Sequence, residues 1–198
     1  MARRGDHSRA EIHRMALDAA ERLIAAEGDR GFSARKVASA IGYTVGTLYL
    51  VFENLDDLVL QVNGRTLDDL FYALQKRQGA TGDDPETALL ALSNAYIAYA
   101  EAESPRWNML FDAVAEKGDN PPDWYQQKLG RVFGLVEAAL SPLTQDATEI
   151  QRVARVLWAS VHGICLLKIR QRMNLAGGQS AEDMARLLIE NFLRGFRG

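Results

Sequence analysis

The sequence contains a single cysteine, Cys165, in 198 residues. One thiol cannot form an intramolecular disulfide, and the basic residues that follow Met1 are not succeeded by the apolar segment of a signal peptide. The uncharged stretch at the hydrophobic centre, residues 156–167, is too short to span a bilayer. These features predict a soluble cytoplasmic protein with no membrane partner.

Metal-binding and nucleotide-binding motifs are lacking too. With three histidines, one cysteine and no CxxC or HExxH spacing, a zinc site would have to recruit scattered carboxylates. The phosphate-binding loops GxxxxGK[ST] and GxGxxG and the GxSxG of hydrolases do not occur either. We therefore expect no metal, no cofactor and no catalytic residues.

Glycine and proline are scarce, at 16 and 5 residues, which excludes collagen-like and low-complexity chains. The apolar content of 47% excludes disorder and is enough for a substantial core. Alternating strand patterns are almost absent, whereas apolar residues recur at three- and four-residue spacing nearly everywhere. The fold class is therefore predicted to be all-α.

Capping and breaking residues divide the chain into about nine expected helices. Ser33, Thr44, Asn54 and Ser180 are candidate N-caps, and Asp84 and Ser104 each precede a proline. Loops are expected at residues 79–84 and 118–122. The expected helices lie near residues 12–26, 33–40, 44–51, 54–78, 85–103, 105–116, 122–140, 146–174 and 180–196.

Two short helices carry the clearest functional pattern. The segments 33–40 and 44–51 flank a tight turn at Gly42, which suits a positive φ, and have helix-turn-helix proportions. In that motif the N-terminal residues of the second helix meet base edges in the major groove. The residues expected to face inward are Val37, Ala38, Ile41, Leu48 and Phe52. Those left to face outward or flank DNA are Thr44, Val45, Thr47, Tyr49 and Leu50.

The residues of this region make the pattern specific. Residues 31–52 resemble the DNA-binding region of the TetR family of bacterial transcriptional regulators, whose Gly-Thr-Leu-Tyr-x-x-Phe pattern stands at residues 46–52. Residues 54–58 look like the start of helix four in that family. The resemblance covers about residues 8–62 by motif and the whole chain by helix plan. Residues 158–163, Trp-Ala-Ser-Val-His-Gly, resemble a recurrent subtype of the ligand-binding domain.

This resemblance implies a three-helix DNA-binding domain at residues 1–53 and a ligand-binding and dimerisation domain at residues 54–198. A long helix would join the head to this helical body. The implied function is a repressor that binds a pseudo-palindromic double-stranded DNA operator as a homodimer and is released by a small-molecule effector. The last two helices would form the dimer interface through Val153, Val156, Leu157, Ser160, Val161, Ile164, Leu167, Leu187, Leu188, Asn191, Phe192 and Phe196.

The resemblance also implies which residues contact DNA: Ser33, Arg35, Lys36, Tyr43, Thr44, Val45, Gly46, Thr47, Tyr49 and Leu50. A phosphate contact suits the Tyr49 hydroxyl, and a thymine methyl suits Val45. Tyr43 fits a core aromatic and a phosphate contact equally well.

Two positions depart from the family pattern, because Val45 and Leu55 stand where lysine is frequent. The loss of two phosphate contacts would weaken DNA binding. Residues 1–50 hold eight basic against six acidic residues, and Arg3 and Arg4 are candidates for an arm that reaches a groove.

Four aromatic residues are candidate effector contacts: Trp107, Phe111, Trp158 and His162. Aromatic bodies with a polar edge suit ligand pockets, but the same residues could equally fill a core. His162 and Cys165 share a helix face, yet without a third partner at a visible spacing a dyad or metal site is disfavoured.

Two other functions remain open on this pattern. A helical enzyme would use Cys165 or a carboxylate as its catalyst and would tolerate changes at Thr47 and Tyr49. A protein-binding adaptor would use the same head, whose second helix is uncharged. Only DNA binding predicts an affinity that falls steeply with salt.

Overall fold

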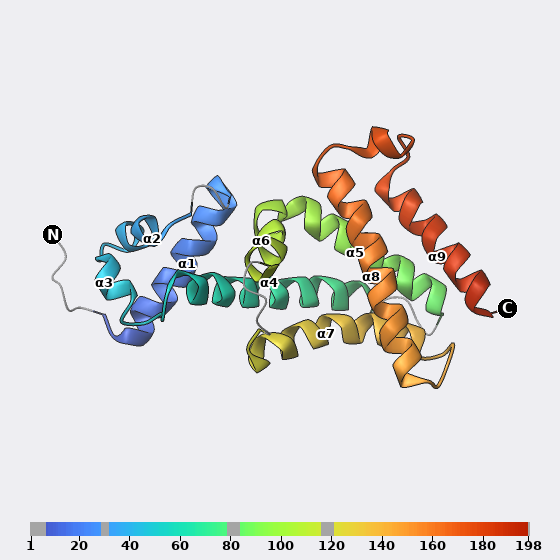
Figure 1. Cartoon of the computed structure of the whole chain (residues 1–198), viewed down its shortest axis with the longest axis horizontal. Coiled ribbons are helices and arrows are strands. Elements are labelled where there is room, and N and C mark those ends of the chain that lie inside the picture. Colours follow the sequence, from blue (N-terminus) through green and yellow to red (C-terminus); the bar gives the residue numbers. More distant parts are fainter. Residues whose placement is uncertain (1–6, 29–31, 79–83, 116–120, 198) are drawn as a thin grey trace. The chain divides into compact units, whose positions relative to one another are not determined.

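The computed structural model describes residues 7–28, 32–78, 84–115 and 121–197 (Figure 1). Within these ranges every regular element is helical, which confirms the predicted all-α fold with nine α-helices. Their bounds are α1 Arg9–Glu27, α2 Ala34–Ala40, α3 Val45–Leu48, α4 Leu55–Gln78, α5 Pro85–Ala102, α6 Ser104–Ala115, α7 Asp123–Leu140, α8 Ala147–Ile169 and α9 Ala181–Arg197, with a 3₁₀ turn, η2, at Met173–Ala176. None of these helices is both long and apolar enough to cross a membrane.

Side-chain caps explain where most helices begin. The oxygen atoms of Ser33, Thr44, Asp84 and Asp146 each accept a backbone N–H from the first turn of the helix that follows. Asn54 does the same for Asp57 at 2.9 Å, and Ser180 for Asp183 at 3.0 Å. The caps expected at Ser33, Thr44, Asn54, Asp84 and Ser180 are thereby confirmed.

The helix expected to run to residue 174 ends earlier, so that prediction was wrong. Beyond α8, Gln171 adopts a left-handed backbone with φ 53°, and the Arg172 N–H donates to the Leu167 carbonyl at 2.7 Å. The Gln171 N–H also donates to Lys168 at 3.0 Å. This is a Schellman ending, which satisfies the last carbonyls of the helix without the glycine that usually marks it in a sequence.

The second short helix is also shorter than expected. It was predicted to reach about residue 51, but α3 ends at Leu48. The N–H groups of Leu50 and Val51 bond to Thr47 and Leu48, three residues back, at 3.2 and 3.1 Å. The chain therefore tightens into turns instead of continuing the α-helix. Most of the loops expected at residues 79–84 and 118–122, and all of the Arg3–Arg4 arm, lie outside the described residues.

The chain divides into two compact units. The first comprises Met1–Thr66 and Pro105–Tyr125, and the second comprises Leu67–Ser104 and Gln126–Gly198. Helix α4 therefore contributes its beginning to the first unit and its end to the second. The functional division at residues 53 and 54 stays a prediction, while by packing α6 joins α1–α3 in the first unit.

The first unit has an apolar core built from α1, α2, α3, α4 and α6. Its buried side chains include Ile24, Val37, Leu48, Phe52, Leu58 and Met109. The buried Asn63 of α4 donates from Nδ2 to the Met109 carbonyl of α6 at 3.0 Å. This bond fixes the register of α6 against α4 within the unit.

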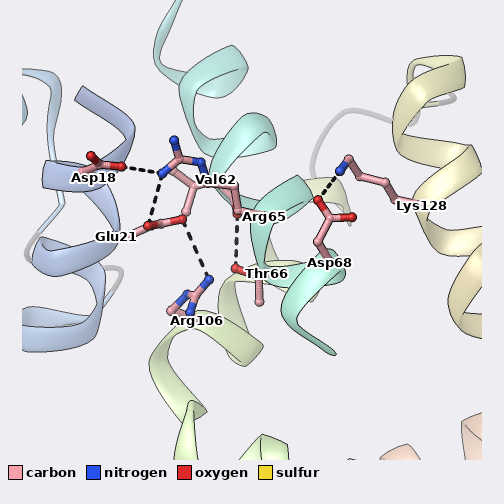
Figure 2. A network of polar contacts seen from close by, with 8 residues as sticks. All are labelled: Asp18, Glu21, Val62, Arg65, Thr66, Asp68, Arg106 and Lys128. Atoms are coloured by element: carbon pink, nitrogen blue, oxygen red, sulfur yellow. Dashed lines mark hydrogen bonds and ion pairs between the residues drawn. The ribbon is translucent and has the colours of Figure 1, made fainter. Parts of the chain in front are cut away.

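Figure 2 shows an ion-pair network that links the same helices. The Arg65 guanidinium of α4 lies 2.7 Å from the Asp18 carboxylate and 3.3 Å from that of Glu21, both on α1. Arg106 of α6 approaches Glu21 at 3.9 Å. Since these groups are only partly exposed, the network adds to the apolar packing that holds α1, α4 and α6 together.

The second unit packs α5 against both α8 and α9, and α8 against α9. In Figure 1, α8 and α9 lie side by side and are joined by the segment that contains η2. Lys168 of α8 bonds to Glu182 of α9 at 2.7 Å and pairs with Glu101 of α5 at 3.0 Å. Burial acts to lower the pKa of Lys168, but the bonds to these two carboxylates raise it overall, so the lysine remains a cation.

Candidate functional site

The turn between α2 and α3 has the geometry that a helix-turn-helix requires. Gly42 has φ 76°, which a residue with a side chain rarely adopts. Its N–H bonds to Ser39, and the Tyr43 N–H bonds to the Ala38 carbonyl at 2.9 Å, which together make a Schellman ending for α2. The predicted positive φ at Gly42 is confirmed, and the turn directs the chain into α3 after two residues.

The buried side of the motif matches the expectation from sequence. All five residues expected to face inward are buried, and Val37 and Leu48 are 0% exposed. Ala38 is small enough for α2 and α3 to approach closely. The orientation of α3 is therefore fixed by packing on its inner face, and its outer face is left for another function.

The outer face of the motif combines hydroxyls with exposed side chains. Tyr49 is 44% exposed and Leu50 is 63% exposed, while Val45 and Thr47 are half-buried. The Thr44 and Thr47 hydroxyls lie 3.0 Å apart, and Thr44 Oγ1 also accepts the Thr47 N–H at 3.3 Å. The predicted residues Thr44, Val45, Gly46, Thr47, Tyr49 and Leu50 thus lie on one short stretch around α3.

The basic residues at the start of α2 differ in their surroundings. The Lys36 ammonium forms an ion pair with the Glu27 carboxylate of α1. Arg35 is exposed, and Ser33 is the N-cap, which accepts the Lys36 N–H at 3.3 Å. Of the two predicted cations, Arg35 forms no ion pair with a carboxylate of the described residues, so its charge is better placed for an anionic partner.

Two residues near the motif were missed by the sequence reasoning. His7 Nδ1 lies 2.9 Å from the Tyr43 hydroxyl, so Tyr43 packs its ring against the core and keeps its polar end at the surface. Arg9 donates from its guanidinium to the Leu50 carbonyl. No local spacing connects these partners, which lie 36 and 41 residues apart in the sequence.

The second unit encloses an apolar cavity of about 50 Å³. The wall comes from helices α4, α5, α7, α8 and α9, and no charged side chain belongs to it. The residues that line it are Leu74, Leu89, Leu92, Ser93, Tyr96, Val132, Phe133, Val136, Leu157, Trp158, Val161 and Ile189. An apolar cavity with few polar groups is the usual form of a small-molecule site.

Of the four predicted effector contacts, Trp158 lines this cavity and His162 contacts two of its lining residues. Trp158 belongs to the wall and stacks on His162, with ring centroids 5.1 Å apart. His162 Nδ1 lies 3.1 Å from the Tyr96 hydroxyl, and burial lowers the pKa of its imidazole. Trp107 and Phe111 pack edge to face on α6 in the first unit and do not line the cavity, so their role stays a prediction.

Apart from Trp158, none of the lining residues was among the four predicted effector contacts. Leucine and valine at helical spacing look the same in a sequence whether they fill a core or border a cavity. Tyr96 was the one lining residue with a distinctive chemistry, and its partner His162 lies 66 positions later.

The last two helices expose a separate apolar face. Val156 of α8 and Leu187 of α9 are 56% and 53% exposed. An open groove beside them is lined by Ser160, Ile164, Gln179, Met184, Leu187, Leu188, Asn191 and Phe192. Most of these residues were expected at a dimer interface.

Three other residues predicted for that interface are buried within the chain. Val153, Leu157 and Val161 are each less than 9% exposed. They follow one another at four-residue spacing and therefore form the inner stripe of α8, which packs against α5 and α9. The expectation that they would face a partner subunit was wrong.

Neither the cysteine nor a metal cluster provides catalytic chemistry in the described part of the chain. Burial raises the pKa of the Cys165 thiol to about 12, so it stays protonated and is a poor nucleophile near neutral pH. Among the described residues, no group of three or more His, Cys, Asp or Glu side chains is placed to hold a metal ion.

The sequence is similar to that of a known transcriptional regulator. A helix-turn-helix-type transcriptional regulator of Mycobacterium tuberculosis, Rv0681, is 29% identical over 143 residues, which cover 72% of this chain and 63% of that protein. This chain therefore spans less than two thirds of the length of that relative.

Solved structures share the fold. A protein of unknown function from Rhodococcus sp. RHA1 superimposes with a TM-score of 0.78 at 18% identity, covering 100% of both chains. The multidrug binding protein EbrR, solved with imidazole, gives a TM-score of 0.63 at 22% identity, covering 94% of this chain and 95% of that one. At such identities the structures establish a common fold and nothing further.

Two family models match the sequence directly. The model for bacterial regulatory proteins of the tetR family matches residues 16–62, which include α2 and α3. The model for the tetracyclin repressor-like C-terminal domain matches residues 89–192, more than half of the chain. The helix-turn-helix and the helical body are thus recognised separately and in the expected order, and the chain belongs to the TetR family of bacterial transcriptional regulators.

Proposed function

We propose that the protein is a homodimeric repressor that binds a pseudo-palindromic DNA operator through α2 and α3. A small-molecule effector bound in the second unit would release it. DNA binding is the activity of the family, while the operator, the dimer and the release by an effector are proposals for this chain.

The observation that carries DNA binding is the contrast between the two sides of α3. Leu48, the last residue of α3, is fully buried, whereas Tyr49 and Leu50 in the turn that follows are exposed. Side-chain hydroxyls position a protein on phosphates, and an apolar side chain such as Val45 can contact a thymine methyl. The exposed Arg35 adds a cation beside them.

The homodimer rests on the apolar face of α8 and α9. Helix α9 has two apolar stripes, since Ala185, Ile189 and Leu193 are buried within the chain while Leu187 is exposed. A two-fold dimer would bury the second stripe against its own copy, and the same symmetry would present two helix-turn-helix motifs to a pseudo-palindromic site.

The cavity of the second unit supports a small-molecule effector. EbrR, which has the same fold, is a multidrug binding protein by name. An effector would release DNA only if it bound one arrangement of the chain more tightly than the other, because a ligand shifts an equilibrium by its differential affinity. Trp158, which lines the cavity, and His162, which stacks on Trp158, are our candidate contacts for the effector.

Family membership decides against a helical enzyme, and the protonated Cys165 thiol agrees with that conclusion. A protein-binding adaptor would instead use the uncharged α3 to contact a protein. Salt dependence of binding separates it from the DNA-binding hypothesis.

The test is selection of bound duplexes from a random DNA library with the full chain. We expect a symmetric consensus with two half-sites separated by about one helical turn or a multiple of it. A matched selection with the Tyr49→Ala/Thr47→Ala double variant should lose the consensus, and one with Tyr72→Ala, another exposed tyrosine, should keep it. Failure of the unaltered protein to enrich any sequence would contradict the proposal.

A further inference from the structure

The cavity of the second unit has a wall that carries no formal charge. Ten of its twelve lining residues are Leu, Val, Ile, Phe or Trp, and the other two are Ser93 and Tyr96. A ligand in this cavity would therefore exchange water for hydrocarbon over nearly all of its surface. The size and chemistry of that surface limit what can bind.

The two hydroxyls of the wall already have protein partners. Ser93 donates to the Leu90 carbonyl at 3.0 Å, within its own helix. The Tyr96 hydroxyl lies 3.1 Å from His162 Nδ1. Because both groups are satisfied by the protein, the wall does not require polar atoms from a ligand to complete its hydrogen bonds.

His162 and Arg155 contact residues of the wall, but neither supplies a countercharge for an anion. Burial lowers the pKa of His162, so its imidazole is predominantly neutral at pH 7. The Arg155 guanidinium lies 4.1 Å from the centroid of the Phe133 ring, and its charge is paired with Glu137. An ionised ligand would consequently lose its hydration without gaining a partner, which weakens its binding relative to that of an uncharged ligand.

We infer that this cavity binds an uncharged, slender hydrocarbon-rich molecule and rejects carboxylate and ammonium compounds of the same shape. The inference rests on the proposed effector site and specifies its ligand class. The volume of about 50 Å³ is far below the roughly 300–1,000 Å³ of drug-sized pockets, which favours a slender alkyl chain over a ring, and even the chain would have to widen the cavity. Wider ligands would have to separate the helices.

Three probes with one chain length test the charge requirement: 1-octanol, octanoate and octylammonium, titrated by calorimetry into the full chain at pH 7. Octanol should bind with a negative heat-capacity change, and both ions should bind about 100-fold more weakly. An affinity for either ion less than tenfold below that of octanol would overturn the inference. So would the absence of octanol binding up to its solubility limit.

Matched variants test the location. Leu92→Trp fills the cavity and should weaken octanol binding by at least tenfold, whereas Leu175→Trp, at an exposed position of η2, should leave it unchanged. If Leu92→Trp does not fold, Leu92→Ala enlarges the cavity and should shift the preferred alcohol from octanol to decanol. Unchanged affinity and unchanged chain-length preference in the folded variant would overturn the assignment.

Release of a selected DNA duplex is measured in the same samples. Octanol binding without DNA release would leave the ligand class standing and remove effector release from the proposed function. If the chain binds DNA but does not bind octanol, the inference fails while the DNA-binding function stands.

Discussion

The helix-turn-helix in the first unit and the α5–α8–α9 layer in the second are built from similar amphipathic helices but leave different surfaces unused. Around α3 the apolar side chains of Val37, Leu48 and Phe52 pack into the core, and the exposed groups are hydroxyls, Tyr49, Leu50 and a cation. Around α8 and α9 apolar surface remains in two places, inside as a cavity and outside as the groove near Leu187. One region is therefore suited to a polar, charged partner and the other to apolar partners.

The largest expected effect concerns the exposed apolar face. Leu187→Asp would place two unpaired carboxylates at a two-fold interface, and we expect the dimer dissociation constant to rise by more than about 100-fold. Sedimentation equilibrium at micromolar concentration measures this. Leu175→Asp, at a more exposed leucine outside the groove, is the control and should remain dimeric. A dimer that survives Leu187→Asp would move the interface elsewhere.

Next in size is a test of packing in the two units. Leu48→Ala in the closed core of the motif should cost about 2–5 kcal/mol of unfolding free energy, near the upper end of that range. Leu92→Ala should fall near the lower end, because a side chain beside a cavity already lacks partners on one side. Chemical denaturation of both variants gives the comparison. Equal costs would show that the cavity wall is packed as tightly as the core.

A smaller effect is expected on the outer face of the motif. Tyr49→Phe removes a hydroxyl proposed to contact phosphate, so affinity should fall about three- to tenfold for every DNA sequence alike. Val45→Ala should instead change the preference at one base position of each half-site. Binding profiles over a duplex library measure both, with Tyr72→Phe as the control for loss of an exposed hydroxyl. The reverse pattern would reject both assignments.

The smallest expected effect comes from pH. Burial lowers the pKa of His162 below its ordinary value of 6.5, so the folded state binds this proton less readily than the unfolded state. The folded state therefore keeps its full stability at a pH above the ordinary pKa of His162. It loses stability as the pH falls through that value toward the lower pKa of the folded state. The thermal unfolding temperature should therefore decrease less between about pH 8 and pH 5 for His162→Gln than for the unaltered chain. Identical dependence of the unfolding temperature on pH in the two proteins would contradict this role of His162.

Much of the fold follows from local signals in the sequence. Side-chain caps at Ser33, Thr44 and Asn54, and the glycine at position 42, act within three or four residues and could be recognised without the structure. The end of α8 could not, because Gln171 adopts a left-handed conformation that is usually reserved for glycine. The inner residues of the motif were likewise predictable, since burial follows the helical period.

The candidate sites were predictable only where a local pattern exists. The outer residues of α3 follow from a contiguous motif, whereas the pairs His7–Tyr43 and Tyr96–His162 join positions far apart in the chain. Val153 and Val161 show a second limit. An apolar residue on α8 can face its own core or a partner, and only the packing of α5 and α9 decides which.

DNA is the proposed partner of the polar region around α3, and the salt dependence of binding to a selected duplex tests this most directly. The logarithm of affinity should fall linearly with the logarithm of salt concentration, with a slope of about −0.9 for each phosphate contacted. Arg35→Gln should make that slope shallower by about two in a dimer, one contact for each subunit. A steep slope that Arg35→Gln reduces is the predicted result, and affinity that does not change with salt would contradict the account.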